Sequence, residues 1–153
     1  MVGMTRWLNP DEQQTWRSFL TASRALMETL DRELQRDAGM PHAYYEILVR
    51  LSEAPQRRLR MSELAESSGS SRSRLSHAAA RLEAAGWIRR EECPTDRRGQ
   101  IAVLTDAGFA TLAAAAPGHV EGVRRHLFDA LSPAQVDQLR RISETLVAHL
   151  TRS

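Results

Sequence analysis

The chain has 153 residues, enough for about one domain. Hydrophobic residues make up 42% and charged residues 26%, with 8 Gly and 6 Pro, which excludes a disordered, collagen-like or low-complexity protein. The net charge is +2, all 21 basic residues are Arg, and ten of them lie between Pro55 and Gln100 against six acidic residues, so the basic excess is in the middle of the chain.

The residue balance favours helices and gives no sign of a membrane or secreted protein. Only 5% of residues are aromatic, while Ala and Leu are abundant, so we expect a mostly helical fold. The longest uncharged stretch, 107–120, is too short to cross a bilayer. The N-terminal residues do not form a secretory signal, and the single Cys93 has no disulfide partner in the chain. We therefore expect a cytoplasmic protein without a membrane span.

Two helices are predicted at the N-terminus. Asn9 can cap a helix that begins at Pro10, has Glu12 in its first turn and continues with apolar residues at helical spacing to Ala38. Such a helix is about 40 Å long, more than a domain of this size can enclose, so part of its apolar stripe should meet a partner. A second helix is predicted from about His42 to Glu53.

The middle of the chain predicts a helix-turn-helix followed by a hairpin. Gly69 and Gly86 each end a helix, and Ser62 and Ser71 precede helices as caps. Apolar and polar residues alternate in two segments after the second of these helices, which predicts a two-stranded hairpin. The expected elements are a short strand at Leu59–Met61, helices at Glu63–Ser68 and Arg72–Ala85, and strands at Trp87–Glu92 and Gln100–Leu104 around the loop Cys93–Gly99.

Two further helices are predicted at the C-terminus. Thr105 can cap a helix from Asp106 to about Ala130 that bends near Pro117, and Ser132 begins a capping signature for the last helix. The fold class is therefore mostly α with a small β hairpin.

The pair of helices around Gly69 has the residues that a helix-turn-helix requires. Ala65 is small where the helices meet, Gly69 tolerates a left-handed turn, and Leu75 faces inward. The opposite face of the second helix is basic and rich in hydroxyls, which suits entry into a DNA major groove. Its residues are Arg72, Ser73, Arg74, Ser76 and His77. A solvated helix pair of a small α protein would show the same turn, so this pattern alone leaves both readings open.

The hairpin that follows adds a second basic element. Its loop contains Asp96, Arg97 and Arg98, and Arg89 and Arg90 lie on the incoming strand, a layout suited to a wing along the DNA backbone and minor groove. Asp96 can hold a neighbouring guanidinium in one orientation. A solvated charged hairpin is the alternative. We assign phosphate contacts to Ser62, Arg81, Arg89 and Arg90.

Several motifs resemble those of the MarR family of winged-helix transcriptional regulators. They are Ser62-Glu-Leu-Ala65, Ser71-Arg-Ser73, Arg81-Leu-Glu83, Gly86, Thr95-Asp-Arg-Arg98 and Val103-Leu-Thr105-Asp-Ala-Gly108. The resemblance covers roughly residues 46–108 in motifs and the whole chain in helix order. One departure is Cys93, where many members have an acidic residue.

The resemblance implies a homodimer that binds double-stranded DNA at pseudo-palindromic operators, commonly as a repressor released by a small ligand. It implies a winged helix-turn-helix at 39–108, between a dimerisation helix at 1–38 and C-terminal dimerisation helices at 109–153. Arg98, braced by Asp96, is then the residue expected in the minor groove. The apolar stripes of the first and last helices independently favour a dimer.

An effector site and redox sensing are less specific expectations. Trp16, His42, Tyr44 and Tyr45 gather near the junction of the first two helices, where family members often bind effectors, so a small aromatic or amphipathic ligand could bind there. Ordinary packing is the competing role of these residues. Cys93 could respond to oxidation if exposed among the arginines, but it is not the N-terminal Cys that the redox-sensing branch of the family uses.

No enzyme signature is present in the sequence. The dispersed His residues and the single Cys have no metal-ligand spacing, and no nucleophile elbow or phosphate-binding Gly loop occurs. We therefore expect no catalysis, no metal and no cofactor. The alternatives to a DNA-binding regulator are a winged-helix protein–protein interaction module and, with less support, a small enzyme with a pocket at a dimer interface.

Overall fold

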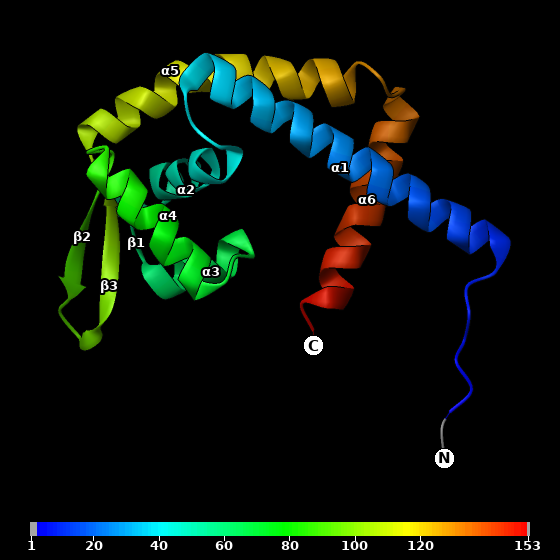
Figure 1. The fold of residues 1–153 in the computed structure, drawn as a ribbon, viewed down its shortest axis with the longest axis horizontal. Helices are drawn as coiled ribbons and strands as arrows, with labels where there is room; N and C mark the ends of the chain where they lie inside the picture. Colours follow the sequence, from blue (N-terminus) through cyan, green and yellow to red (C-terminus); the bar gives the residue numbers. More distant parts are fainter. Residues whose placement is uncertain (1–2, 153) are drawn as a thin grey trace. The chain divides into compact units, whose positions relative to one another are not determined.

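A computed structural model describes residues 3–152, apart from the side chains of Arg97 and Arg98. The described chain is mainly helical, with one small antiparallel sheet (Figure 1). The elements in chain order are α1 (Pro10–Ala38), α2 (His42–Glu53), a 3-10 turn η1 (Pro55–Arg57), β1 (Arg58–Arg60), α3 (Met61–Ser68), α4 (Arg72–Ala84), β2 (Ile88–Cys93), β3 (Asp96–Leu104), α5 (Asp106–Val123), a π-helical turn η2 (Arg124–Phe128) and α6 (Pro133–Leu150).

The chain forms two compact units. One comprises residues 31–121 and contains the sheet with α2, α3 and α4; the other combines the residues up to 30 with those from 122 onward and contains α6. Helices α1 and α5 each contribute residues to both units. The expected division at residues 38 and 108 stays a prediction. No described helix combines the length and apolarity needed to cross a bilayer.

Local capping signals place most of the helices where the sequence predicts them. The Asn9 side chain accepts a bond from the Glu12 N–H at 2.8 Å, and Glu12 accepts one from the Asn9 N–H at 3.0 Å, so a capping box begins α1. Ser71 caps α4, and Ser132 begins α6 with a second capping box. These bonds reach only three residues along the chain, which makes them visible in the sequence.

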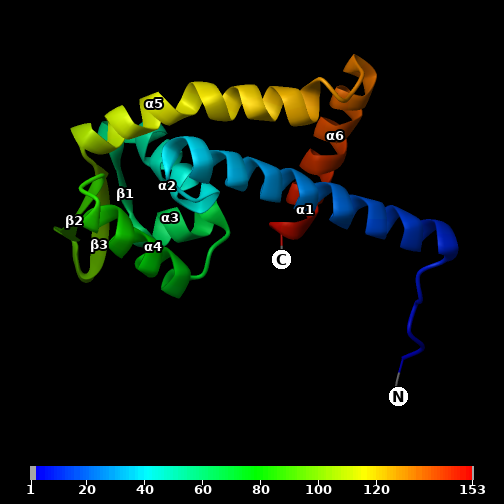
Figure 2. The ribbon, with the colours of Figure 1, turned by 45° about the horizontal axis from the view of Figure 1, so that its top comes forward.

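The sheet has the strand order β1-β3-β2, and both pairings are antiparallel. Helices α2, α3 and α4 gather beside it in both views (Figure 1, Figure 2). The expected Cys93–Gly99 loop is wrong: only Pro94 and Thr95 separate the strands, because Cys93 pairs with Asp96 across a bulge that keeps the following residues in β3.

Other boundaries also differ from the prediction, and β2 is Ile88–Cys93 rather than Trp87–Glu92. The first strand is Arg58–Arg60 rather than Leu59–Met61. Helix α3 begins directly after it at Met61, so Ser62 lies inside the first turn of α3 and does not cap the helix. Helix α5 runs through Pro117 but ends at Val123. The chain then widens into the π-helical turn, in which the Asp129 N–H donates to the Arg124 carbonyl at 2.8 Å, instead of continuing as α-helix to Ala130.

The core of the 31–121 unit joins the helices to the sheet. Leu48, Leu51, Leu64, Leu82 and Ile88 are its largest fully buried side chains together with Met40. The inward face of α4 contributes Leu75, Ala78, Ala79 and Leu82, the residues expected there. This packing holds α4 by its apolar face and leaves its polar face outward.

Candidate nucleic-acid interface

The outward face of α4 is basic and exposed. Leu75, Ala78, Ala79 and Leu82 form the buried face of α4, so the residues on the other sides of the helix point away from the core. All five side chains predicted to read DNA lie on that exposed side: Arg72, Ser73, Arg74, Ser76 and His77. The helix therefore presents donors from two guanidiniums, two hydroxyls and an imidazole on one surface.

The turn before α4 sets the direction of this face. Gly69 ends α3 with φ of 65°, a left-handed conformation that favours glycine, and its N–H donates to the Glu66 carbonyl at 3.4 Å. Ala65, 6% exposed, packs in the core where a larger side chain would separate the two helices. Ser71 then begins α4 by accepting a bond from the Arg74 N–H at 3.2 Å. The helix-turn-helix that the sequence predicts is present.

The hairpin tip is built around Cys93. This thiol is 6% exposed and lies 3.4 Å from the Thr95 hydroxyl, and the hydrogen bond from Thr95 lowers its pKa below the usual value. A Cβ on Gly99 would come within 3.3 Å of the Cys93 Cβ and 3.4 Å of an Asp96 carboxylate oxygen. Burial limits access of an oxidant to Cys93. The predicted roles of Arg97 and Arg98 concern side chains outside the described part of the structure.

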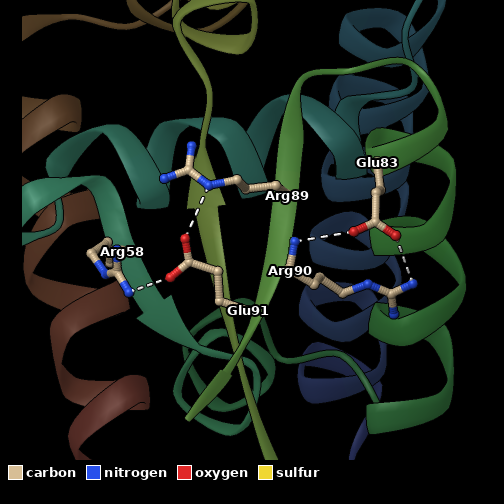
Figure 3. A network of polar contacts seen from close by, with 5 residues as sticks. All are labelled: Arg58, Glu83, Arg89, Arg90 and Glu91. Carbon is tan, nitrogen blue, oxygen red and sulfur yellow. Dashed lines mark hydrogen bonds and ion pairs between the residues drawn. The ribbon is translucent and has the colours of Figure 1, made fainter. Parts of the chain in front are cut away.

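Two arginines predicted to contact phosphates are held by carboxylates instead of extending freely. Arg90 donates to Glu83 of α4 at 3.1 Å, and Glu91 accepts from Arg89 at 3.0 Å and from Arg58 at 2.5 Å (Figure 3). The Arg90 bond lowers the pKa of Glu83, and bonds from Arg89 and then Arg58 lower the pKa of Glu91. These pairs brace the hairpin against α4 and β1.

The other two predicted phosphate contacts, Ser62 and Arg81, are exposed on α3 and α4. A hollow of about 490 Å³ opens between the starts of these helices and the hairpin, and its lining includes Arg60, Ser62, Arg72 and Ser76. Sequence reasoning missed Arg60. The sequence did contain a signal for it. Arg58 and Arg60 stand on either side of Leu59, and residues two apart in a strand share a face, so both arginines should point away from the core if Leu59 points inward.

The aromatic residues considered for an effector site are only partly brought together. The rings of Tyr45 and His119 lie 4.4 Å apart, and those of His42 and His119 lie 5.4 Å apart. Burial, and then His42, lower the pKa of His119, while burial raises the pKa of Tyr45. Tyr44 packs partly buried against the core, and Trp16 belongs to the other compact unit, 6.4 Å from Phe19. The sequence did not point to His119, which lies 74 positions after Tyr45.

Metal binding has no support in the described residues, where no group of three or more His, Cys, Asp and Glu side chains is placed to hold an ion.

The comparison with known proteins decides the family. The transcriptional repressor MprA of Escherichia coli K12 is 31% identical over 125 residues, which cover 82% of this chain and 70% of MprA. A family model described as "MarR family" matches residues 38–99, the segment that holds α2 to the hairpin tip. This chain belongs to the MarR family.

Solved MarR structures resemble this one over nearly the whole chain. Sco3205 from Streptomyces coelicolor, a MarR family transcriptional regulator solved in complex with DNA, is 55% identical with a TM-score of 0.91, covering 95% of this chain and 92% of its own. AbsC from the same organism is 44% identical with a TM-score of 0.90, covering 97% and 100%. The fold is therefore the winged helix-turn-helix of MarR regulators, with α4 as its recognition helix and β2–β3 as its wing.

Proposed function

We propose that this MarR family member is a homodimeric transcriptional regulator that binds a pseudo-palindromic DNA operator and represses nearby genes. The observation that carries the proposal is the recognition helix α4, whose exposed face holds Arg72, Arg74, Ser76 and His77 opposite a buried apolar face. Bidentate Arg contacts to guanine are the commonest specific contacts in a major groove. MprA, a repressor, and Sco3205, solved with DNA, support the proposal as relatives.

The action is binding rather than catalysis. Two recognition helices related by a twofold axis would enter successive major grooves, about 34 Å apart, while each wing reaches the adjacent backbone and minor groove. In this arrangement Arg98, with Asp96 beside it, enters the minor groove. Arg81 and Ser62 contact phosphates, whereas Arg89 and Arg90 contribute only if their bonds to Glu91 and Glu83 rearrange.

The dimer is supported by apolar side chains that are exposed in the single chain. In α6, Ile142, Leu146 and Leu150 are 58%, 43% and 68% exposed, although they lie at the spacing of one helix face. In α1, Trp16 and Phe19 are 52% and 51% exposed. A twofold partner would bury such stripes.

A small aromatic or amphipathic effector is the proposed signal for release from DNA. Its candidate contacts are His42, Tyr44 and Tyr45, since His42 and Tyr45 adjoin the His119 ring within one compact unit. An effector can shift operator affinity only by the ratio of its affinities for the free and DNA-bound states. Release of a labelled operator by such a ligand, reduced in Tyr45→Ala, would support this part of the proposal.

Selection on a random duplex library tests the DNA function directly. The purified protein is selected at near-physiological salt, and the enriched sequence then competes against a scrambled duplex. We expect a pseudo-palindrome that binds at least about a thousandfold tighter than the scramble. Failure to enrich any sequence would overturn the proposal and favour a winged-helix module that binds another protein.

A further inference from the structure

The hollow between the recognition helix and the wing has the composition of an anion site. It has a volume of about 490 Å³, and α3, α4, β1 and β3 all contribute to its lining. Arg60 and Arg72 supply two positive charges, and Ser62 and Ser76 supply two hydroxyls. All four side chains are exposed, so a ligand can reach them from solvent.

Arg60 is the best-positioned donor of this hollow. One of its terminal nitrogens donates to the Thr95 hydroxyl at 2.9 Å, which links β1 to the turn of the wing. That bond ends on a neutral group and uses one of five guanidinium donors, so the charge and the remaining N–H groups stay available. The side chain is thereby ordered before a ligand arrives, which lowers the entropy lost on binding.

Arg58, two residues earlier on the same strand face, shows the opposite arrangement. Its guanidinium donates to the Glu91 carboxylate at 2.5 Å, and Glu91 also accepts from Arg89 (Figure 3). The Glu91 carboxylate therefore already offsets the charge of Arg58. The strand therefore carries one arginine that braces the sheet and one that can serve a ligand.

The remaining charge in the hollow does not cancel the two arginines. Asp96 is the acidic residue of its lining, and its single carboxylate offsets only one of the two guanidinium charges. Two guanidiniums and two hydroxyls against one carboxylate suit a singly charged phosphodiester. The hollow also opens beside the exposed face of α4, where the backbone of a bound duplex would pass.

We propose that this hollow receives one backbone phosphate of the bound duplex, with Arg60 as its main donor and Thr95 as the residue that positions Arg60. The inference rests on the proposed DNA function and adds to it a main phosphate donor, Arg60 of β1, that lies outside the recognition helix and the wing arginines. A phosphate contact carries no base information, so it strengthens specific and non-specific binding alike.

The salt dependence of DNA binding tests this contact. Operator affinity is measured from low to near-physiological KCl for wild type, Arg60→Gln and the matched control Arg58→Gln, with circular dichroism to verify folding. We expect Arg60→Gln to reduce the slope of log K against log salt by about 0.9 for each bound protomer, and to weaken operator and scrambled duplexes by the same factor. Arg58→Gln should leave the slope unchanged.

The outcomes separate this proposal from the DNA function itself. Suppose that the operator affinity of wild type falls steeply with salt concentration but Arg60→Gln keeps the wild-type slope and affinity. The phosphate site is then wrong, and the DNA function stands. If wild type shows no sequence-selective, salt-dependent binding, the DNA function fails first. An equal loss of slope in Arg58→Gln would also overturn the assignment to Arg60.

A second measurement locates the phosphate on the DNA. Operator duplexes are made with one uncharged methylphosphonate linkage at a time and titrated with wild type and Arg60→Gln. We expect one position in each half-site where the neutral linkage weakens wild type but not Arg60→Gln, because both changes remove the same contact. Equal effects of every linkage on the two proteins would overturn the proposal.

Discussion

At the scale of single residues, we expect the exposed face of α4 to divide into residues that read bases and residues that contact phosphates. Arg74 lies near the helix N-terminus, whereas Arg81 lies two turns later, and both side chains are exposed. The N-terminal residues of a recognition helix are the ones that reach base edges. The two arginines should therefore have different effects on specificity although they lie on the same helix.

Replacing Arg74 with Ala should cost about 1–3 kcal/mol in binding to the selected operator, with a much smaller effect on a scrambled duplex, because a base contact is lost. Arg81→Ala should weaken both duplexes by a similar factor, because a phosphate contact is lost. Fluorescence anisotropy with the operator and the scrambled duplex measures, for each variant, the ratio of the two affinities. Identical specificity ratios for wild type and Arg74→Ala would remove Arg74 from the set of base readers.

His119 makes stability depend on pH. Its pKa lies below the ordinary 6.5, first because of burial and then because of His42, while Glu46 and Glu33 oppose the shift. The unfolded chain then binds a proton at a pH where the folded chain does not. The free energy of unfolding should be highest above about pH 6.5 and fall as the pH drops through the lowered pKa.

Urea unfolding of wild type and His119→Gln between pH 7.5 and pH 5 tests this expectation. The variant loses ring packing against Tyr45 and should be less stable throughout. The informative quantity is the difference between the two proteins, which should shrink as the pH falls because only wild type has the buried imidazole to protonate. A constant difference across the range would contradict the role of His119.

At the scale of elements, the turn after α4 is held by a close contact between chain segments. The Thr105 hydroxyl donates to the Gly86 carbonyl at 2.7 Å and accepts from the Gly108 N–H at 3.0 Å, so Thr105 joins the turn to the start of α5. The chains approach so closely that a Cβ on Gly108 would lie 2.0 Å from the Trp87 carbonyl oxygen. Only glycine fits there without a backbone shift.

Gly108→Ala should therefore destabilise the protein by about 3 kcal/mol, the upper part of the usual range for overpacking. Gly118→Ala on the same helix is the control, since nothing lies within 4 Å of its Cβ position. That change should be neutral or stabilise by about 0.5–1 kcal/mol, because alanine favours helix. Thermal unfolding monitored by circular dichroism compares them, and similar losses would contradict the close-contact argument.

The same elements show which features a sequence can predict. Caps at Asn9, Ser71 and Ser132 use bonds to residues three positions away, so their helices begin where expected. Ser62 failed as a cap because the start of α3 depends on the preceding strand, whose extension depends on pairing with β3. The Arg60–Thr95 bond spans 35 positions and has no local signature.

Electrostatics account for the other limits on site prediction. Four arginines near the hairpin look alike in the sequence, but Glu83 and Glu91 hold Arg90, Arg89 and Arg58, whereas Arg60 bonds to a hydroxyl. Composition alone therefore predicts that the region is positively charged, but it does not show which guanidiniums are available to bind a phosphate. The exposed face of α4 was predictable, because helical periodicity determines it from Leu75, Ala78, Ala79 and Leu82.

At the scale of the whole molecule, DNA recognition by a twofold dimer depends on the association of two chains. No described residue of α6 is buried within the single chain, and Leu139, Ile142, Leu146 and Leu150 share one face of it. A charge in the middle of that face would have to be buried on association, which costs several kcal/mol without a partner. Ile142→Glu should therefore shift the protein from dimer to monomer in light-scattering measurements.

Ala148→Glu is the matched control, because residue 148 is exposed on the opposite face of α6 and gains the same charge. It should remain dimeric. If the dimer is required for operator binding, Ile142→Glu should also lose most of its preference for a pseudo-palindrome over a single half-site, because its two recognition helices no longer bind as one unit. If the Ile142→Glu protein is still a dimer, α6 does not form the interface. If it is a monomer that keeps wild-type operator affinity, the twofold arrangement is not needed for recognition.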